Sequence, residues 1–296
     1  MTGTEVRVAL ITGCSTGIGR ATALRLDASG WSVYAGVRRQ EDADSLAAAG
    51  SERLTPLIID VTDPGSIAAA AERVEAESAA GLGALVNNAG VAYTGPLEFV
   101  PLDELRNQLE VNVTGHVAIT QALIPALRRA RGRIVNVTSI GGIVATPFFG
   151  PYNASKYALE AISDCLRVEL RPWGIDTITI EPGSISTEIW TSGLDQFDRT
   201  EERMPAEAQT LYGKAIKGLR RAARQTGERG IPADHAAAVI EKALVVSRPR
   251  ARYLIGRDAR VMATLSRVLP RSPLGSRDRA DHGPALRWSD RGGRMP

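Results

Sequence analysis

A tyrosine and a lysine four positions apart are the residues whose types and spacing most directly suggest chemistry. In "SIGGIVATPFFGPYNASKYALE", residues 139–160, Tyr152 and Lys156 would share one face of a helix that begins after a proline. A positive charge about 5 Å from a phenol, at an effective dielectric constant near 20, offers about 3 kcal/mol, or roughly two pKa units. We therefore expect Lys156 to lower the pKa of Tyr152, which would then act as a general acid or base between an alcohol and a carbonyl. Tyr157 has Ala161 at the equivalent spacing and is expected to be structural.

Two other polar positions could assist that phenol. Ser139 ends the apolar run at 132–139, where its hydroxyl can donate to a substrate oxygen as charge develops on it. The neighbouring Thr138 is an alternative donor, and a serine that merely ends a strand would look the same. Asn112, in "EVNVTG", lies inside a long predicted helix, a position that asparagine disfavours. It therefore suggests a role, with a locally bonded asparagine as the alternative.

The elements that must position these residues follow from an alternation of short apolar runs and helical patterns. Most runs are apolar nearly throughout, which is typical of parallel strands buried on both faces. The alternation predicts an α/β fold: a doubly wound, Rossmann-like parallel sheet of about seven strands with helices on both faces. Ligands bind such a sheet beyond the carboxyl ends of its strands. The expected strands are 6–12, 32–38, 54–60, 84–90, 132–139, 176–183 and 251–256, and the expected helices are 17–29, 41–49, 64–79, 102–130, 152–171 and 232–247.

The length of 296 residues suits one large domain, which we place at residues 1–270. Residues 184–231 interrupt the alternation and are predicted to hold no strand. A connection of this length is usually functional or disordered, and we interpret it as a substrate lid with one amphipathic helix. A plain surface insertion is the alternative. The apolar positions at helical spacing are Met204, Ala208, Leu211, Ala215 and Leu219.

A glycine-rich turn follows the first strand in "VALITGCSTGIGRATALRL". Gly13 would permit the tight turn, Gly17 would let a pyrophosphate approach the backbone, and Gly19 would allow close packing of helix and strand. The helix that follows offers free N–H groups and a positive dipole end to phosphates. The turn therefore predicts a dinucleotide site, and a plain tight turn is the alternative.

Several motifs together carry a resemblance to a known family. The spacing G-x-x-x-G-x-G preceded by Thr12, the "NNAG" at 87–90 and the Y-x-x-x-K at 152–156 resemble the compact branch of the short-chain dehydrogenase/reductase family across about residues 6–256. "GCSTGIGR" and "VYAGVRR" more loosely resemble its hydroxysteroid and retinol dehydrogenase group. The resemblance implies an NAD(P)-dependent enzyme acting on CH–OH or C=O groups, with a water-linked proton path through the lysine. It implies the catalytic set Asn112, Ser139, Tyr152 and Lys156.

The choice of cofactor depends on the end of the second strand, where an acidic residue usually holds the ribose hydroxyls of NAD. In "SVYAGVRRQ" the comparable position is Val37, followed by Arg38 and Arg39. A guanidinium can bind a 2′-phosphate through bidentate, charge-assisted hydrogen bonds. We therefore favour NADP over NAD and assign Arg38 to the phosphate. Two solvated arginines are the alternative.

The resemblance also assigns the remaining cofactor contacts. It places Asp60 against adenine and Asn88 with Gly90 on the adenosine side, although a capping aspartate and a plain turn would look similar. It matches the backbone of Ile185 and the hydroxyl of Thr187 to the nicotinamide carboxamide. The cofactor set is Gly13, Ser15, Thr16, Gly17, Ile18, Gly19, Arg38, Asp60, Val61, Asn88, Ala89, Gly90, Tyr152, Lys156, Pro182, Gly183, Ile185 and Thr187.

Bulky aromatic residues near the expected active edge bear on the substrate. They suggest an apolar alcohol or carbonyl compound of steroid, retinoid, fatty or aromatic type, with core packing as the alternative. Family members commonly pair through helices equivalent to 102–130 and 152–171, which implies a homodimer or homotetramer. A non-catalytic NADP(H)-sensing protein is the rival hypothesis for the function. The aromatic residues are Phe148, Phe149, Trp190 and Phe197.

Composition limits the remaining classes of protein. Two distant cysteines, Cys14 and Cys165, and three histidines predict neither a disulfide framework nor a metal site, and indicate a cytoplasmic setting. No leader pattern or membrane-length apolar run is expected.

The Arg-rich end of the chain accounts for its net charge. Residues 271–296 hold six arginines and three aspartates, and the rest of the chain carries 30 basic and 30 acidic residues. Rich in glycine, proline and arginine, this tail is predicted to be disordered. We expect a solvated terminus rather than a tether to nucleic acid or an anionic membrane.

Overall fold

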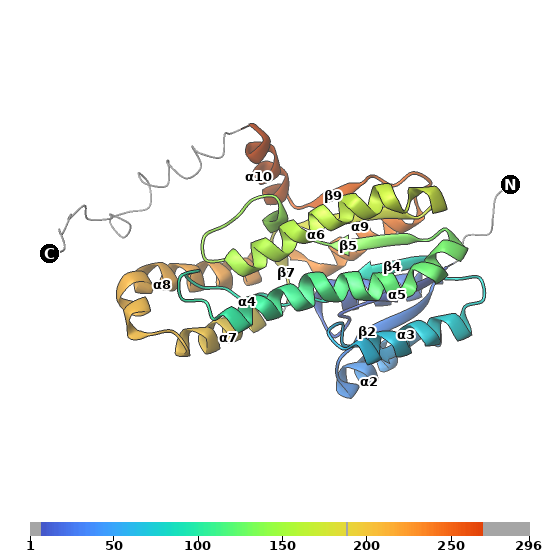
Figure 1. The fold of residues 1–296 in the computed structure, drawn as a ribbon, viewed down its shortest axis with the longest axis horizontal. Coiled ribbons are helices and arrows are strands. Elements are labelled where there is room, and N and C mark those ends of the chain that lie inside the picture. Colours follow the sequence, from blue (N-terminus) through green and yellow to red (C-terminus); the bar gives the residue numbers. More distant parts are fainter. Residues whose placement is uncertain (1–6, 188, 269–296) are drawn as a thin grey trace.

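The computed structural model describes residues 7–187 and 189–268, drawn as a ribbon in Figure 1. The predicted tail at 271–296 lies outside the described residues. Within the described part, no helix is both long enough and apolar enough to cross a membrane.

Seven parallel strands form the central sheet, in the order β3-β2-β1-β4-β5-β6-β9. The five central strands are buried nearly throughout and mostly apolar, as expected for strands covered on both faces, whereas the edge strands β3 and β9 are partly exposed. The strand order changes direction between β1 and β4, and a doubly wound sheet binds ligands beside such a point. The strands are β1 (Val8–Ile11), β2 (Ser32–Val37), β3 (Leu54–Ile58), β4 (Ala84–Asn87), β5 (Arg133–Val137), β6 (Asp176–Pro182) and β9 (Arg252–Ile255).

Helices cover both faces of the sheet (Figure 1). One buried cluster joins the sheet to α1, α2 and α9, and a second joins it to α3, α5 and the end of α6. The predicted α/β architecture is therefore confirmed. The helices that pack on the sheet are α1 (Gly17–Ala28), α2 (Gln40–Ala49), α3 (Pro64–Glu77), α5 (Gly115–Ala130), α6 (Gly150–Glu169) and α9 (Ala233–Val245).

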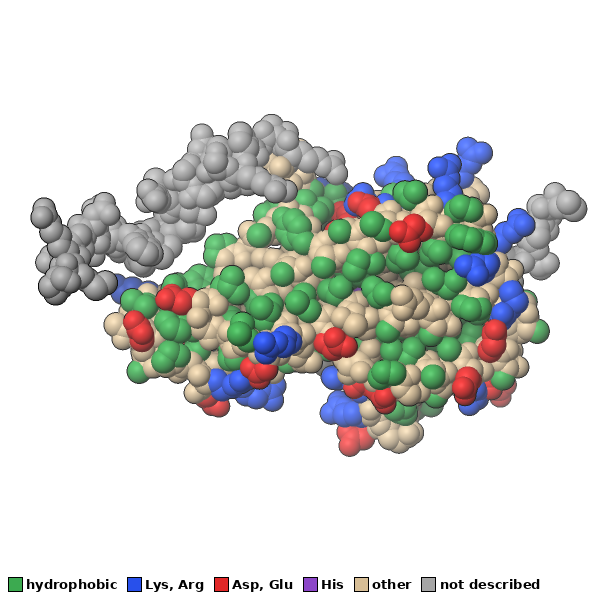
Figure 2. Space-filling model, viewed as in Figure 1, with side chains coloured by type: hydrophobic (Ala, Val, Ile, Leu, Met, Phe, Trp, Pro, Cys, Tyr) green, Lys and Arg blue, Asp and Glu red, His purple; other side chains and the backbone are tan. Residues whose placement is uncertain are grey.

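The helix expected at 102–130 is divided in the structure. It consists of α4 (Leu102–Leu109), a π-helical segment (Glu110–Thr114) and α5. Figure 2 shows apolar side chains spread across the face that α4, α5 and α6 present to the viewer. Leu102 and Val168 are 62% and 74% exposed, respectively.

The region at 184–231 differs from its prediction of one helix and no strand. It holds two helices, α7 (Ile189–Glu202) and α8 (Ala206–Arg229). The predicted apolar stripe crosses Pro205, and a proline disfavours a continuous helix because it lacks an N–H donor. The two ends of the region also form a small parallel sheet of β7 (Ile185–Ser186) and β8 (Ile231–Pro232). A further helix, α10 (Arg257–Val268), follows β9 and was not predicted.

Candidate active site

Tyr152 and Lys156 lie in the first two turns of α6, as the i, i+4 spacing predicts. The helix begins at Gly150, and Pro151 occupies its first turn, where a missing N–H costs nothing. The Lys156 ammonium is buried and lies 5.7 Å from the centre of the Tyr152 ring. Its Nζ donates to the carbonyl oxygen of Val137 at 2.9 Å, which ties the lysine to the end of β5.

The predicted lowering of the Tyr152 pKa is wrong. Burial raises the pKa of this phenol, and the hydrogen bond to Ser139 opposes that change only in part. Burial also lowers the pKa of Lys156 to about 8, since it penalises the ammonium, while the charge of Glu160 acts in the opposite direction. The prediction counted the attraction between the two groups and omitted the free energy needed to bury the phenolate.

Ser139 follows β5, and its side chain lies within hydrogen-bonding reach of Tyr152. It is buried, accepts a hydrogen bond from the Gly141 backbone N–H at 3.0 Å, and is bonded to the phenol of Tyr152. The alternative donor, Thr138, already donates to the carbonyl oxygen of Ile180 at 2.9 Å. Tyr157 points elsewhere and donates to the carbonyl oxygen of Ile143. The geometry thus pairs Ser139 with Tyr152, whereas the hydroxyls of Thr138 and Tyr157 bond to other groups.

Asn112 lies in the π-helical segment and is fully buried. Its amide accepts from the backbone N–H of Val91 at 2.9 Å and donates to the Val91 carbonyl oxygen at 3.0 Å. It also donates to Ser155 Oγ at 3.1 Å, and Ser155 is the residue just before Lys156. A π-helical turn is frequent at functional sites. Here the asparagine fastens the chain after β4 to the helix that carries Tyr152.

Sequence reasoning missed two side chains in this cluster. Gln108, one turn before Asn112, accepts from the Tyr93 N–H at 2.7 Å and donates to the Val91 carbonyl at 2.7 Å. His116, one turn after it, lies 2.7 Å from the Ala89 carbonyl through Nε2. Burial and the nearby Lys156 charge lower the pKa of His116 to about 3. The available signal was three polar residues spaced four apart on one helix.

The glycine-rich turn is held against the chain that follows β4. Asn88 Nδ2 donates to the carbonyl oxygens of Thr12 and Gly13 at 3.0 and 2.9 Å. The Thr12 hydroxyl accepts from the backbone N–H groups of Asn88 and Ala89, each at 3.0 Å. A Cβ on Gly13 would lie 2.7 Å from Ala89 Cα, and one on Gly19 would lie 2.2 Å from the Gly13 oxygen. Both glycines are therefore required by close approach of backbone segments.

The start of α1 is open to an anion. Gly17 has a φ of +57°, and among the described residues a Cβ there would meet only the side chain of Thr187, at 3.2 Å. The N-cap residue Thr16 makes no side-chain hydrogen bond to the helix, and the first turn contains no acidic residue. The first N–H groups of a helix have no acceptor within it. Ser15 and Ile18 complete this partly exposed turn.

The chain after β6 returns to the same place. Pro182 is buried at the end of β6, and Gly183 is followed by Ser184, whose N–H donates to Asp258 Oδ2 at 2.8 Å. Ile185 is buried and pairs with Ile231. The structure therefore brings Thr187 against the glycine turn, although about 170 residues of sequence separate them.

Arg38 and Arg39 follow β2 and are both exposed, but their surroundings differ. Arg39 forms a bidentate ion pair with Asp42, with nitrogen–oxygen distances of 3.1 and 3.3 Å. Arg38 has no ion-pair partner within the described residues. Asp60, at the end of the next strand, accepts from both the N–H and the hydroxyl of Thr62, and these bonds lower its pKa.

Two further residues of the predicted cofactor set are Val61 and Gly90. Val61 is buried against Gly115, where a Cβ would meet the Val61 oxygen at 2.7 Å. Gly90 is exposed beside Asn112. The described residues hold no cluster of three His, Cys, Asp or Glu side chains arranged for a metal.

The aromatic residues divide between core and site. Phe197 is buried in the packing of α7, so the core alternative holds for it. Phe148 stands four positions before Tyr152. Its φ of +69° is a strained value for a bulky residue. Its ring lies edge-on to Tyr212 of α8, with ring centres 6.2 Å apart. Phe149 is partly exposed, and the side chain of Trp190 lies outside the described residues.

Comparison with known proteins agrees with this arrangement. Residues 7–196 match the family described as short chain dehydrogenase. The chain is 36% identical to an NADPH-dependent 3-dehydrocapnine reductase of Ornithobacterium rhinotracheale, over 84% of this chain and 88% of that protein. It is 38% identical to human retinol dehydrogenase 5, over 88% of this chain and 84% of that protein.

A solved structure supports the same conclusion. A short chain dehydrogenase of Burkholderia cenocepacia, in complex with NADP, superposes with a TM-score of 0.71 at 28% identity, covering 92% of this chain and 97% of that one. The chain therefore belongs to the short-chain dehydrogenase family, whose members are nicotinamide-dependent oxidoreductases acting on CH–OH and C=O groups.

Proposed function

We propose that this protein is an NADP-dependent alcohol dehydrogenase or carbonyl reductase with Tyr152 as its general acid and base. The observation that carries the proposal is the cluster of Tyr152, Ser139 and Lys156 at the carboxyl edge of the sheet. The same edge carries the glycine turn at the start of α1. A cofactor-sensing protein without turnover would not need this combination.

The residues present fit a dinucleotide with a 2′-phosphate. The uncapped start of α1 and Gly17 suit a diphosphate, because N–H groups and the helix dipole favour negative charge there. Arg38, which has no ion-pair partner in the part of the chain that the structure describes, suits a 2′-phosphate, since Arg39 is already engaged by Asp42. Two similar proteins support the choice of NADP, because the 3-dehydrocapnine reductase is NADPH-dependent and the Burkholderia enzyme was solved in complex with NADP. Ile185 and Thr187 would then contact the nicotinamide end.

The protein residues would manage the proton. When bound, the nicotinamide supplies or accepts the hydride at the substrate carbon. The raised pKa of Tyr152 keeps the phenol protonated at neutral pH, which is the form that donates to a carbonyl oxygen during reduction. The Ser139 hydroxyl would stabilise the developing charge on that oxygen. Lys156, held by Val137, would return a proton toward the phenol after each turnover.

We also propose an apolar substrate covered by residues 184–231 acting as a lid. Phe148, Tyr212 and Phe99 form an aromatic series between the segment before Tyr152 and α8. The similarity to retinol dehydrogenase supports a retinoid, steroid, fatty or aromatic compound. A homodimer or homotetramer through α4, α5 and α6 is proposed as well, and the exposed Leu102 and Val168 favour it. Sedimentation of the full-length protein tests the assembly.

The test of the function combines turnover with a single-atom change. The protein is mixed with NADPH or NADH and a panel of retinoid, steroid, fatty and aromatic ketones or aldehydes, and cofactor absorbance is followed. Reduction with NADPH is expected, and Tyr152→Phe should lower kcat by about a hundredfold to ten-thousandfold. Tyr157→Phe is the matched control and should retain activity. Unchanged turnover in Tyr152→Phe would refute the assigned mechanism, and tight NADPH binding without turnover would favour the sensing protein.

A further inference from the structure

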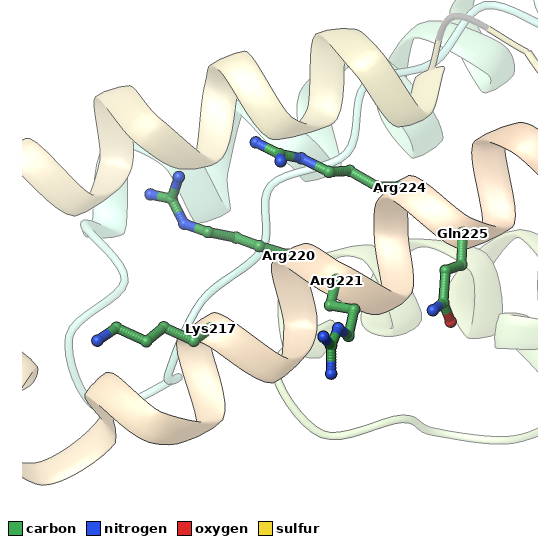
Figure 3. A pocket seen from close by; sticks show the side chains of 5 residues that line it. All are labelled: Lys217, Arg220, Arg221, Arg224 and Gln225. Carbon is green, nitrogen blue, oxygen red and sulfur yellow. The ribbon is translucent and has the colours of Figure 1, made fainter.

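A concave surface on α8 gathers four basic side chains that the proposed reaction does not use. Lys217, Arg220, Arg221, Arg224 and Gln225 line an open groove with a volume of about 370 Å³ (Figure 3). Their spacing of three and four residues places them along one stripe of the helix. They lie more than one turn before the helix ends at Arg229, beyond the reach of its dipole. The dipole therefore does not explain the excess of positive charge.

One of the four basic residues is fixed, and the other three are available. Arg220 pairs with Asp198 at 2.7 Å and with Glu201, and its guanidinium lies 5.2 Å from the centre of the Phe197 ring. These contacts join α8 to α7 along one side of the groove. Lys217, Arg221 and Arg224 have no ion-pair partner among the described residues. Like charges this close repel one another, and a bound anion would relieve the repulsion.

The helix that carries the groove is tied to the active edge on both sides of it. Before the groove, the Tyr212 ring contacts Phe148, which lies in the segment leading to Tyr152. After it, Ile231 pairs with Ile185, which follows β6. At a rise of 1.5 Å per residue, the basic stripe begins roughly 8 Å and ends roughly 18 Å along the helix from Tyr212. An aromatic surface and a cationic surface thus follow each other along one element.

We propose that this groove binds the anionic headgroup of an amphiphilic carbonyl substrate whose apolar chain extends toward Phe148 and Tyr152. The proposal rests on the proposed function, and it narrows the substrate class to long-chain compounds with a carboxylate, phosphate or sulfonate group. Guanidinium groups bind such anions through paired hydrogen bonds, while the aromatic residues contact the chain. A neutral retinoid or steroid would leave the basic groups without a partner.

Binding without turnover provides the first test. Dodecanoate and dodecanol are titrated calorimetrically into the full-length protein and into the double variant Arg221→Gln/Arg224→Gln. Dodecanoate should bind at least about tenfold more tightly than dodecanol, and the double variant and high salt should each remove that advantage. Lys214→Gln, an exposed change on the same helix outside the groove, is the matched control and should keep it. Equal affinity for acid and alcohol, or an undiminished advantage in the double variant, would overturn the proposal.

Turnover provides the second test, and it distinguishes failure of the headgroup site from failure of the proposed reductase function. A mid-chain oxo-octadecanoate and its methyl ester are compared with NADPH, and the double variant should lower kcat/KM about tenfold for the acid alone. Turnover of both substrates without dependence on the groove refutes the headgroup site and leaves the reductase intact. Binding of dodecanoate that depends on the groove, without any turnover, refutes the reductase and leaves the anion site. Charge dependence seen only with phosphatidylserine vesicles would make the groove a membrane contact and overturn the proposal.

Discussion

The carboxyl edge of the sheet and the α7–α8 segment meet around Phe148 but are held by different forces. At the edge, buried and partly buried amides bond directly to the backbone, as Asn112 does to Val91 and Asn88 does to Thr12. In the segment, partly exposed ion pairs such as Arg220 with Asp198 join α7 to α8, beside buried apolar side chains such as Phe197 and Ile216. Buried hydrogen bonds cannot exchange for water without loss, whereas exposed ion pairs contribute little. The edge is therefore built for fixed geometry, and the segment for adjustment to a substrate.

The largest effect on stability is expected from Asn112→Ala. The change leaves the N–H of Val91 without its side-chain partner and removes the bond to the buried Ser155 hydroxyl, whereas Gln108 still donates to the Val91 carbonyl. The free energy of unfolding should fall by roughly 1 to 3 kcal/mol, measured by urea denaturation. The control Asn107→Ala, on α4, removes an exposed hydrogen bond to the Tyr93 hydroxyl. It should lower the free energy of unfolding by about 0.5 kcal/mol or less. Similar losses in the two variants would contradict the rigid-edge interpretation.

A pH dependence should follow from His116, which is buried beside Lys156. Its pKa is lowered from 6.5 to about 3, so the unfolded chain takes up a proton across that interval and the folded protein does not. The stability that His116 contributes above pH 6.5 is therefore lost as the pH falls toward 3, by about 1.4 kcal/mol per pH unit. The free energy of unfolding, measured by urea denaturation at several pH values, should fall with this slope in wild-type protein relative to His116→Gln as the pH is lowered. The control His235→Gln, an exposed change on α9, should show the same dependence of stability on pH as wild type. The same dependence in His116→Gln would contradict the assignment.

The cofactor end of the edge offers a matched pair of arginines. Arg38→Gln should weaken NADPH binding roughly tenfold to a hundredfold, because a charge-assisted bond to the 2′-phosphate is lost. NADH binding should not change, since NADH lacks that phosphate. Arg39→Gln should alter NADPH affinity much less, as Asp42 already engages that guanidinium. Fluorescence titration of both cofactors measures the effects, and equal losses in the two variants would remove Arg38 from the site.

How far the sequence predicts the molecule also differs between the two regions. The seven strands and the covering helices were predicted from apolar runs and helical spacing, because burial on both faces leaves a local pattern. The positions of Tyr152 and Lys156 on one helix face followed from the same periodicity. The sequence did not predict the π-helical segment itself. Its only local signal was Asn112, a residue that is unfavourable inside a helix.

The remaining features depend on contacts between distant residues. Pairing of Ile185 with Ile231 and the approach of Thr187 to Gly17 leave no local signal. Pro205, which separates α7 from α8, is visible in the sequence. The apolar residues at helical spacing continue across it, however, and that pattern favoured a single helix. The sign of the Tyr152 pKa shift depends on the burial of the phenol, which spacing alone does not provide.

The smallest effect is expected where the two regions join. Glu104 of α4 is buried and accepts from Thr200 at 2.7 Å and Arg203 at 2.9 Å, which anchors the end of α7. Glu104→Gln weakens the charge-assisted bond, so KM for carbonyl substrates should rise roughly threefold to tenfold while the NADPH dissociation constant stays unchanged. Asp103→Asn, which alters only the exposed partner of the same arginine, should change KM less than about twofold. A loss of NADPH affinity as large as the rise in KM would mean that the segment and the edge form one rigid unit, because a disturbance of α7 would then reach the glycine turn.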